Sequence, residues 1–408
     1  METSLIDVPD GTITTPRGFL AGAIAAGMRA DYEPGRLDLG LVYSERSCAA
    51  AGAYTKNTFR GPPVLITERH LANGRAQAII ANSGVSNSLL GEEGMRHAVE
   101  MAQLAGEKLD LDPHDVVVAS TGVTGWRLPI ERIGEGVPRI ILSEDGGDAF
   151  AHAIMTTDLV AKQAAVRFDW DGVTYAVGGT AKGSGMIHPD MATMLAFLTT
   201  DAPIEPAVLA PLLTGVVDAS FNMLTIDGDT SPNDTVVLLA NGAAGLDGSG
   251  FGPQHPALPL LRAAVQRVAV SLTRELARDG EGASKLLEVT VEHAARETDA
   301  RRAAKAIAGS LLVKTAVFGG DPNWGRILVA FGNTGVDAEE KRITLRLQDV
   351  EVYRGGAPVV FDNTALARAL AQSEVRIRVD LGIGDAAATA WGCDLTPEYV
   401  RINSEYTT

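Results

Sequence analysis

Residues 182–195 read KGSGMIHPDMATML, and this stretch decides how the chain is interpreted. A small residue, Ala192, precedes Thr193, and an apolar, strand-like segment runs from Met194 to Leu198. A threonine hydroxyl is a weak nucleophile that needs an adjacent base. If the Ala192–Thr193 peptide bond breaks, Thr193 gains an α-amine with an ordinary pKa of about 7.7–8.0, which can serve as that base. The stretch therefore indicates a self-cleaving N-terminal nucleophile, with an ordinary strand entered through a Pro-Asp turn as the alternative.

The residues around this bond favour the first interpretation. Gly183 and Gly185 permit backbone conformations and close approaches that other residues resist. Lys182 places a cation in the same segment, and Pro189 restricts the chain shortly before the bond. His188 is not assigned as the base, because a histidine in such a loop is typically solvated.

The composition is that of a compact globular protein. Of its residues, 46% are hydrophobic and 21% are charged. Its length of 408 residues exceeds what one hydrophobic core usually accommodates, so two or more packed lobes are expected. Its formal net charge is −16 and no block of Lys and Arg occurs. Such an acidic chain repels polyanions, which argues against nucleic acid or an anionic membrane as a partner.

Cysteine usage and the first residues favour the cytoplasm. Cys48 and Cys393 are far apart and neither has a CxxC partner, so buried free thiols in a reducing compartment are expected. The segment 1–10 is acidic, unlike a signal peptide, and the apolar run 19–28 is too short and glycine-rich to span a bilayer. The seven histidines show no HExxH or paired metal spacing, so no metal is implied.

Hydrophobic periodicity predicts a mixture of helices and strands. Apolar spacing indicates a helix over 93–108, and Asp171-Gly172 is a hairpin-turn signal inside 164–178. Strict alternation indicates half-buried strands over 287–292, 342–347 and 375–380. Further strands are expected at 41–44, 64–67, 76–81 and 116–119, further helices at 204–218, 257–278, 297–308 and 364–372, and a loop at 241–256.

These elements predict an α+β chain, with α and β mixed, rather than a doubly wound parallel sheet. Strands that look antiparallel alternate with helices, and no repeat or low-complexity linker divides the sequence. We expect two lobes built around mixed sheets.

Acyl transfer needs, besides a nucleophile and a base, donors for an oxyanion and groups that hold the substrate. The segment Ser120-Thr121-Gly122-Val123-Thr124-Gly125 follows an expected strand, and such a turn can aim a backbone N–H and a hydroxyl at one point. A tight turn that uses glycine for its conformation is the alternative. Lys182 is a candidate for binding a carboxylate or for stabilising charge near Thr193, and Glu281 is a candidate for binding an ammonium. As bare residues, both are more often solvated surface charges.

The chain resembles the ornithine acetyltransferase family (glutamate N-acetyltransferase, the ArgJ type) over nearly its whole length. The stretch around Thr193 resembles that family's nucleophile signature. The other matching segments follow in the family's order: Thr15–Phe19, Ser120–Val123, Met155–Asp158, Asp227–Thr230, Asp279–Gly282, Asp321–Arg326, Trp391–Thr396 and Tyr399–Thr408.

The resemblance implies a fold like that of the N-terminal-nucleophile enzymes and assigns roles to individual residues. Thr193 would be the nucleophile, and Thr121 and Gly122 the oxyanion pair. The first substrate contact is placed at Thr156, with Thr157 as the alternative. The full set of implied substrate contacts is Thr156, Lys182, Thr193, Glu281, Asn403 and Thr408.

The resemblance also implies the reaction. Cleavage between Ala192 and Thr193 would give chains 1–192 and 193–408, assembled as an α2β2 heterotetramer. The mature enzyme would move an acetyl group from N2-acetyl-L-ornithine to L-glutamate by ping-pong kinetics, without a resident cofactor. A bifunctional enzyme that also takes acetyl-CoA remains an alternative, although the sequence shows no phosphate-cradling loop.

Three other functions stay open at this point. A hydrolase with the same nucleophile, an amidohydrolase or aminopeptidase, would share Thr193 and the cleavage. A nucleotide-binding oxidoreductase would use residues 179–185, but their spacing is not GxGxxG. A catalytically silent binding homologue is the third.

Overall fold

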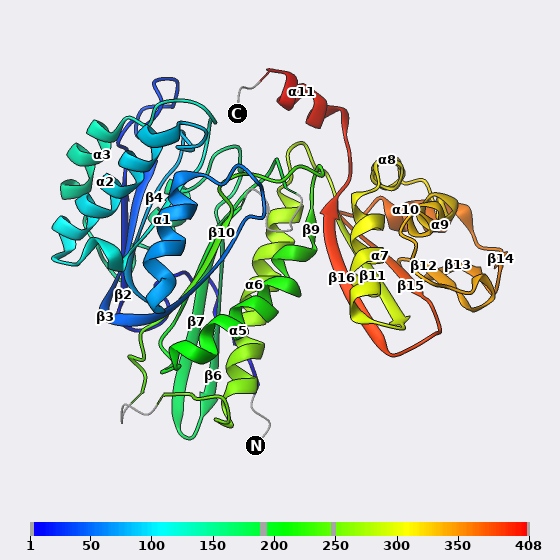
Figure 1. Cartoon of the computed structure of the whole chain (residues 1–408). Helices are drawn as coiled ribbons and strands as arrows, with labels where there is room; N and C mark the ends of the chain where they lie inside the picture. Colours follow the sequence, from blue (N-terminus) through cyan, green and yellow to red (C-terminus); the bar gives the residue numbers. More distant parts are fainter. Residues whose placement is uncertain (1–3, 188–193, 246–249, 406–408) are drawn as a thin grey trace.

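The computed structural model describes residues 4–187, 194–245 and 250–405, and it contains two mixed β-sheets. In the described part of the chain the first sheet has the order β1-β6-β7-β8-β10-β3-β4-β5, with β2 also paired to β3 (Figure 1). Its strands are β1 (Ile6–Asp7), β2 (Phe19–Ile24), β3 (Leu39–Tyr54), β4 (Arg75–Asn82), β5 (Val116–Ser120), β6 (Lys162–Trp170), β7 (Val173–Lys182), β8 (Leu195–Thr200) and β10 (Thr235–Ala240).

The second sheet belongs to the carboxy-terminal lobe and has the order β14-β13-β12-β15-β11-β16-β9. Its strands are β9 (Leu224–Thr225), β11 (Leu286–Ala294), β12 (Thr344–Leu347), β13 (Val350–Arg354), β14 (Ala357–Pro358), β15 (Glu374–Asp380) and β16 (Ala386–Cys393). Both sheets contain parallel and antiparallel pairs, for example β8 parallel to β10 and β7 antiparallel to β8. The predicted mixed architecture with two lobes is therefore confirmed.

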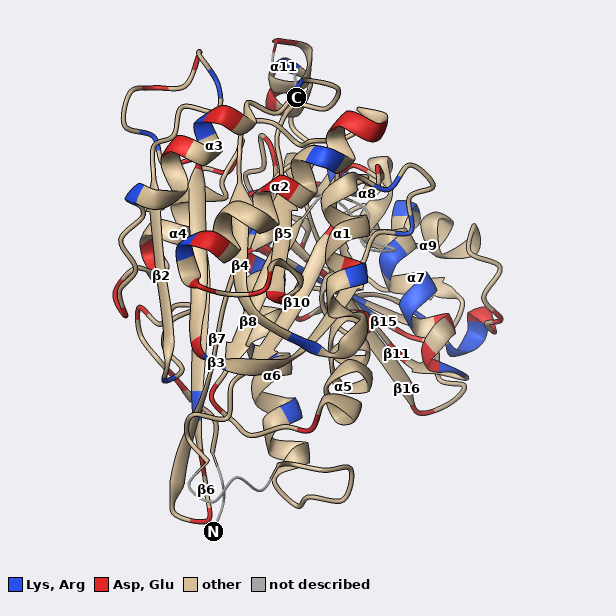
Figure 2. Ribbon diagram, turned by 60° about the vertical axis from the view of Figure 1, so that its left-hand side comes forward, with Lys and Arg blue, Asp and Glu red and all other residues tan. Residues whose placement is uncertain are grey.

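Helices flank both sheets. In the described residues they are α1 (Pro62–His70), α2 (Gly91–Leu109), α3 (Ile130–Gly136), α4 (Gly147–Ala153), α5 (Pro206–Asp218), α6 (Leu258–Arg278), α7 (Glu297–Gly309), α8 (Leu311–Gly319), α9 (Trp324–Gly332), α10 (Asn363–Leu370) and α11 (Pro397–Glu405). Charged residues of both signs are spread over outer helices such as α2, α3 and α7 (Figure 2).

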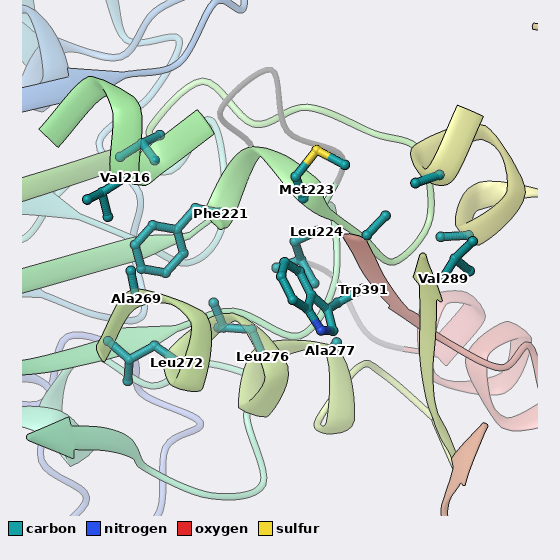
Figure 3. Close-up of a cluster of buried hydrophobic side chains, with 14 of the residues drawn as sticks. Val216, Phe221, Met223, Leu224, Ala269, Leu272, Leu276, Ala277, Val289 and Trp391 are labelled. Atoms are coloured by element: carbon teal, nitrogen blue, oxygen red, sulfur yellow. The ribbon is translucent and has the colours of Figure 1, made fainter. Parts of the chain in front are cut away.

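The two lobes share one hydrophobic core, which runs through α5 and α6. Helix α6 packs against β6 and β7 of the first sheet and also contacts β11 and β16 of the second. Figure 3 shows the join, where Phe221 and Leu272 lie on one side and Val289 and Trp391 on the other. The lobes are therefore joined by buried apolar contacts rather than by a linker.

Most elements appear where the sequence predicts them. The hairpin turns at Asp171 and Gly172, both with positive φ (49° and 77°), as a tight turn between paired strands requires. The predicted strands at 41–44, 76–81 and 116–119 lie in β3, β4 and β5, and the predicted helices lie in α2, α5, α6, α7 and α10. The described residues of 241–256 form no helix or strand, as predicted for a loop.

The predicted strand at 64–67 is wrong, because these residues lie in α1. Two prolines, Pro62 and Pro63, occupy the first turn of the helix, where proline is favoured. The β-branched residues that suggested a strand form the buried face instead. The Thr67 hydroxyl donates to the Val118 carbonyl of β5 at 2.7 Å, so packing on the sheet overrides local propensity. Helix α8, which ends before the Asp321–Arg326 motif, and helix α9, which begins within it at Trp324, were not predicted.

One described segment, Pro206–Met223, is long and apolar enough by length and composition to cross a membrane. Half of it is buried, and Leu209, Val216 and Phe221 lie in the shared core. These contacts are those of a core helix.

A division between residues 192 and 193 does not follow the lobes. Strands β8 and β10 come after that point, yet they lie in the first sheet between β7 and β3, which come before it. The two segments therefore interleave within one sheet.

Candidate active site

A cavity of about 310 Å³ opens beside the end of β7. Residues that are far apart in sequence line it, and they include six of the predicted site residues: Thr121, Gly122, Thr156, Lys182, Glu281 and Asn403. Ala192, Thr193 and Thr408, together with His188 and Pro189, lie outside the described residues. The structure thus brings together every described residue of the predicted site.

Thr121 and Gly122 form a turn directly after β5. Gly122 has φ 125°, and a Cβ on it would lie 2.3 Å from the Gly84 carbonyl carbon, so no larger residue fits. The N–H groups on either side are used: Thr121 donates to the Asn82 carbonyl and Val123 to that of Gly84. No described residue accepts the Gly122 N–H. The turn therefore has the form of an oxyanion site.

Lys182 ends β7 with its side chain almost completely buried. Its ammonium donates to the Thr121 hydroxyl at 3.1 Å and to the Thr156 hydroxyl at 2.7 Å. By accepting from Lys182, the Thr121 hydroxyl keeps its own proton for donation elsewhere. Burial lowers the pKa of Lys182, and the carboxylate of Asp158 opposes that shift.

Glu281 supplies a negative charge to the same cavity. It is 7% exposed and accepts hydrogen bonds from the Thr157 hydroxyl and the Asn403 amide, each at 2.8 Å. A Cβ on Gly185 would lie 2.3 Å from the Glu281 carboxylate, so the absence of a side chain there makes room for the acid. Both partners of Glu281 are neutral, which leaves its charge available to a cation in the cavity.

Two aspartate side chains hold the described residues that flank 188–193. Asp227 accepts from the backbone N–H groups of Met186 (2.6 Å) and Ile187 (2.8 Å) on one side. On the other side Asp234 Oδ1 accepts from the Met194 N–H at 2.9 Å, and its buried Oδ2 has no partner among the described residues. Burial raises the pKa of Asp234 well above its ordinary value, which favours a neutral carboxyl group next to the start of β8.

One residue of this site, Thr157, was predicted only as an alternative, and others were not predicted. Thr157 bonds to Glu281, whereas Thr156, the residue chosen from the sequence, bonds to Lys182, so both line the cavity. The motif Met155–Asp158 indicated that a threonine of this segment contacts the site, but not which residue each threonine bonds to. Asn233 also lines the cavity, and its amide donates to the Ser120 carbonyl just before the oxyanion turn.

Outside the cavity, the two cysteines are buried and free, as predicted. Burial raises the pKa of the Cys48 thiol to about 12 and also raises that of Cys393, so neither is a reactive thiolate at neutral pH. Within the described ranges no group of three or more His, Cys, Asp or Glu side chains is placed to hold a metal ion.

With this geometry in view, the comparisons with known proteins identify the family. The ArgJ family model matches residues 20–408. The chain belongs to the ArgJ family. A relative from Symbiobacterium thermophilum, named arginine biosynthesis bifunctional protein ArgJ, is 48% identical over 98% of this chain and 99% of its own. A relative of the same name from Dehalococcoides mccartyi is 47% identical over the full length of both chains.

A crystal structure of the ArgJ protein from Bacillus halodurans is also similar. It is 41% identical, with a TM-score of 0.50, and it covers 52% of this chain and 98% of its own chain. The family named from sequence motifs is thereby confirmed, and the cavity is the candidate active site of an ArgJ enzyme.

The oxyanion turn can be tested by exchanging its glycine for alanine. We expect Gly122→Ala to lower the free energy of unfolding by about 1–3 kcal/mol more than Gly125→Ala, because its methyl group meets the Gly84 backbone. Gly125 is the matched control: it also has positive φ (79°), but nothing lies within 4 Å of its Cβ position. Denaturant unfolding measures the difference, and equal losses for the two variants would show that the turn is not this tight.

Proposed function

We propose that the protein is a cytoplasmic glutamate N-acetyltransferase that moves an acetyl group from N2-acetyl-L-ornithine to L-glutamate through an acetyl-Thr193 intermediate. The observation that carries this proposal is the pairing of a buried cation, Lys182, and a buried carboxylate, Glu281, in one cavity beside an oxyanion-type turn. Membership of the ArgJ family and relatives named for arginine biosynthesis support it.

Two of the charged residues that line the cavity match the charges of the donor. N-Acetylornithine carries an α-carboxylate and, on its side chain, an ammonium. Lys182 is suited to the carboxylate together with the Thr156 hydroxyl, and Glu281 is suited to the ammonium. A substrate held between the two has its acetyl group fixed relative to the protein, which is the positioning that acyl transfer needs.

Maturation precedes transfer. The Thr193 hydroxyl attacks the Ala192 carbonyl, the peptide nitrogen leaves as the α-amine, and an ester joins the two residues. Water then hydrolyses this ester and releases chain 1–192 with a new carboxylate and chain 193–408 with a free amine. The hydrogen bonds from Met186 and Ile187 to Asp227 and from Met194 to Asp234 hold the residues on either side of this segment.

The solved chain from Bacillus halodurans is close in size to the second of the two proposed chains. That solved chain is matched almost completely, yet it covers only 52% of this chain. Residues 193–408 make up slightly more than half of the sequence.

Transfer repeats the same chemistry on a small molecule. The Thr193 α-amine takes the hydroxyl proton as the oxygen attacks the acetyl carbonyl, and the Gly122 N–H and Thr121 hydroxyl donate to the oxyanion. The C–N bond breaks, and ornithine leaves with the proton. The amine of glutamate then attacks acetyl-Thr193 by the reverse route, which gives ping-pong kinetics. We propose an α2β2 assembly of the two chains, and Thr408 as a further substrate contact.

Acetyl-CoA as a second acyl donor is a second candidate activity, favoured by the word bifunctional in the names of the relatives. It would use the same Thr193. Incubation with acetyl-CoA and glutamate, without acetylornithine, tests it: acetylglutamate forms only if the enzyme is bifunctional.

Replacing the nucleophile tests cleavage and transfer together. We expect Thr193→Ala to give one uncleaved chain without transferase activity, because both steps need the hydroxyl. A denaturing gel, intact mass and an assay of acetylglutamate measure the outcome. Persistent cleavage in the variant would reject Thr193, and release of acetate in place of acetylglutamate by the unmodified protein would indicate a hydrolase.

Removing the charge of Glu281 tests how the donor is held. We expect Glu281→Gln to lower kcat/KM for N-acetylornithine about 10- to 100-fold, mainly through a higher KM, because a hydrogen bond to a charged group contributes about 1.5–3 kcal/mol. Glu398→Gln, which changes an exposed acid paired with Arg401 on α11, is the control. An unchanged KM in Glu281→Gln would place the ammonium elsewhere.

A further inference from the structure

Four buried charged side chains lie together at the wall of the cavity. Lys162, the first residue of β6, donates to Asp158 Oδ1 at 2.6 Å and to Asp279 Oδ2 at 2.5 Å. Asp158 Oδ2 is 4.0 Å from the Lys182 ammonium. The side chains of Asp158 and Lys162 are completely buried. Of this group, only Lys182 lines the cavity.

Asp158 also fixes the backbone beside two groups of the cavity. Its carboxylate accepts from the N–H of Thr156 at 3.0 Å and from that of Gly183 at 2.7 Å. Gly183 directly follows Lys182, so one carboxylate orients both the lysine and the threonine to which that lysine donates. Asp279 lies two residues before Glu281, and Lys162 therefore connects Asp158 to the segment that carries Glu281.

Lys182 needs a nearby negative charge, because burial disfavours its ammonium form. Asp158, Glu281 and Asp234 favour the charged form of Lys182, and the ammonium of Lys162 disfavours it. Asp234 contributes least of the three acids, because burial raises its own pKa. Asp158 is the strongest of the favourable three. The ammonium groups of Lys182 and Lys162, together with the Gly183 N–H, in turn keep the pKa of Asp158 low, at about 2, against the effect of burial.

We propose that Asp158 is a positioning residue that keeps Lys182 charged and directed at Thr121 and Thr156, and that Lys162 links this carboxylate to the Glu281 segment. The inference rests on the proposed function in one respect: Lys182 is taken to bind the substrate's carboxylate. The pH at which substrate affinity is lost then depends on Asp158, which does not itself line the cavity.

Two variants of the cluster have opposite expected effects. In Asp158→Asn the lysine loses its counter-charge and keeps Lys162 as a neighbour, so it gives up its proton at lower pH. Loss of an opposite charge at this distance moves a titration by about 1–3 pH units. In Lys162→Met the repelling ammonium is gone, so Lys182 stays charged to higher pH.

Calorimetric titration of the mature protein with ornithine between about pH 5.5 and pH 9 is the experiment. We expect the affinity of Asp158→Asn to fall at lower pH than that of the unmodified protein and to recover on acidification, and that of Lys162→Met to fall at higher pH. Asp148→Asn, an exposed acid on α4, is the control and should match the unmodified protein. An Asp158→Asn curve with an unchanged midpoint, or with an equal loss at every pH, would overturn the proposal.

The charge of Lys182 can also be measured without a ligand. Acetic anhydride acylates neutral amines, so peptide mass spectrometry across the pH range reports when Lys182 loses its proton. The reactive form should appear at lower pH in Asp158→Asn and at higher pH in Lys162→Met. If the unmodified protein does not bind ornithine, the proposed function fails. The pH midpoints of acetic anhydride labelling then still show whether Asp158 keeps Lys182 charged. If Asp158→Asn does not fold, the labelling midpoint of Lys162→Met tests the same proposal.

Discussion

The register of β8 between β7 and β10 is the constraint on which the site depends. Leu195 lies opposite Lys182 of β7 on one side and Thr235 of β10 on the other. This pairing places the start of β8 beside the end of β7, where the buried cation enters the cavity. A shift of one residue would turn every side chain of β8 to the opposite face of the sheet. Hydrogen bonds along three strands thus fix where β8 begins relative to Lys182.

Three aspartate side chains, of which Asp158 and Asp234 are buried and Asp227 is half-buried, do the remaining positioning. Asp227 and Asp234 hold the residues on either side of 188–193. Asp158 accepts from the N–H groups of Thr156 and of Gly183, the residue after Lys182. Each accepts from backbone N–H groups, which stabilise a buried charge or polar group that would otherwise be costly. The excess of acidic residues in the composition therefore includes groups with structural roles, in addition to those that keep the surface charged.

The family and the charged residues of the cavity could be predicted from the sequence more completely than the secondary structure around them. Strands and helices with strict periodicity, such as 287–292 and 257–278, were correctly placed, because one face of each is buried in a core. The helix at 62–70 was mistaken for a strand, since its β-branched residues pack on β5 and hide the helical signal. Lys182 and Glu281 could be recognised in the sequence as opposite charges. Thr157 and Asn233 contact residues more than a hundred positions away, which spacing along the chain does not reveal. The role of Asp158 depends on the direction of its side chain, which the sequence does not give either.

The most direct test of the account is intact-mass spectrometry of the active protein after mixing with N-acetylornithine in the absence of glutamate. The proposed mechanism predicts two chains that meet between residues 192 and 193, with one acetyl group on the chain that begins at Thr193, and loss of that group when glutamate is added. An active protein that is one continuous chain, or in which the acetyl group is never found on Thr193, would contradict it.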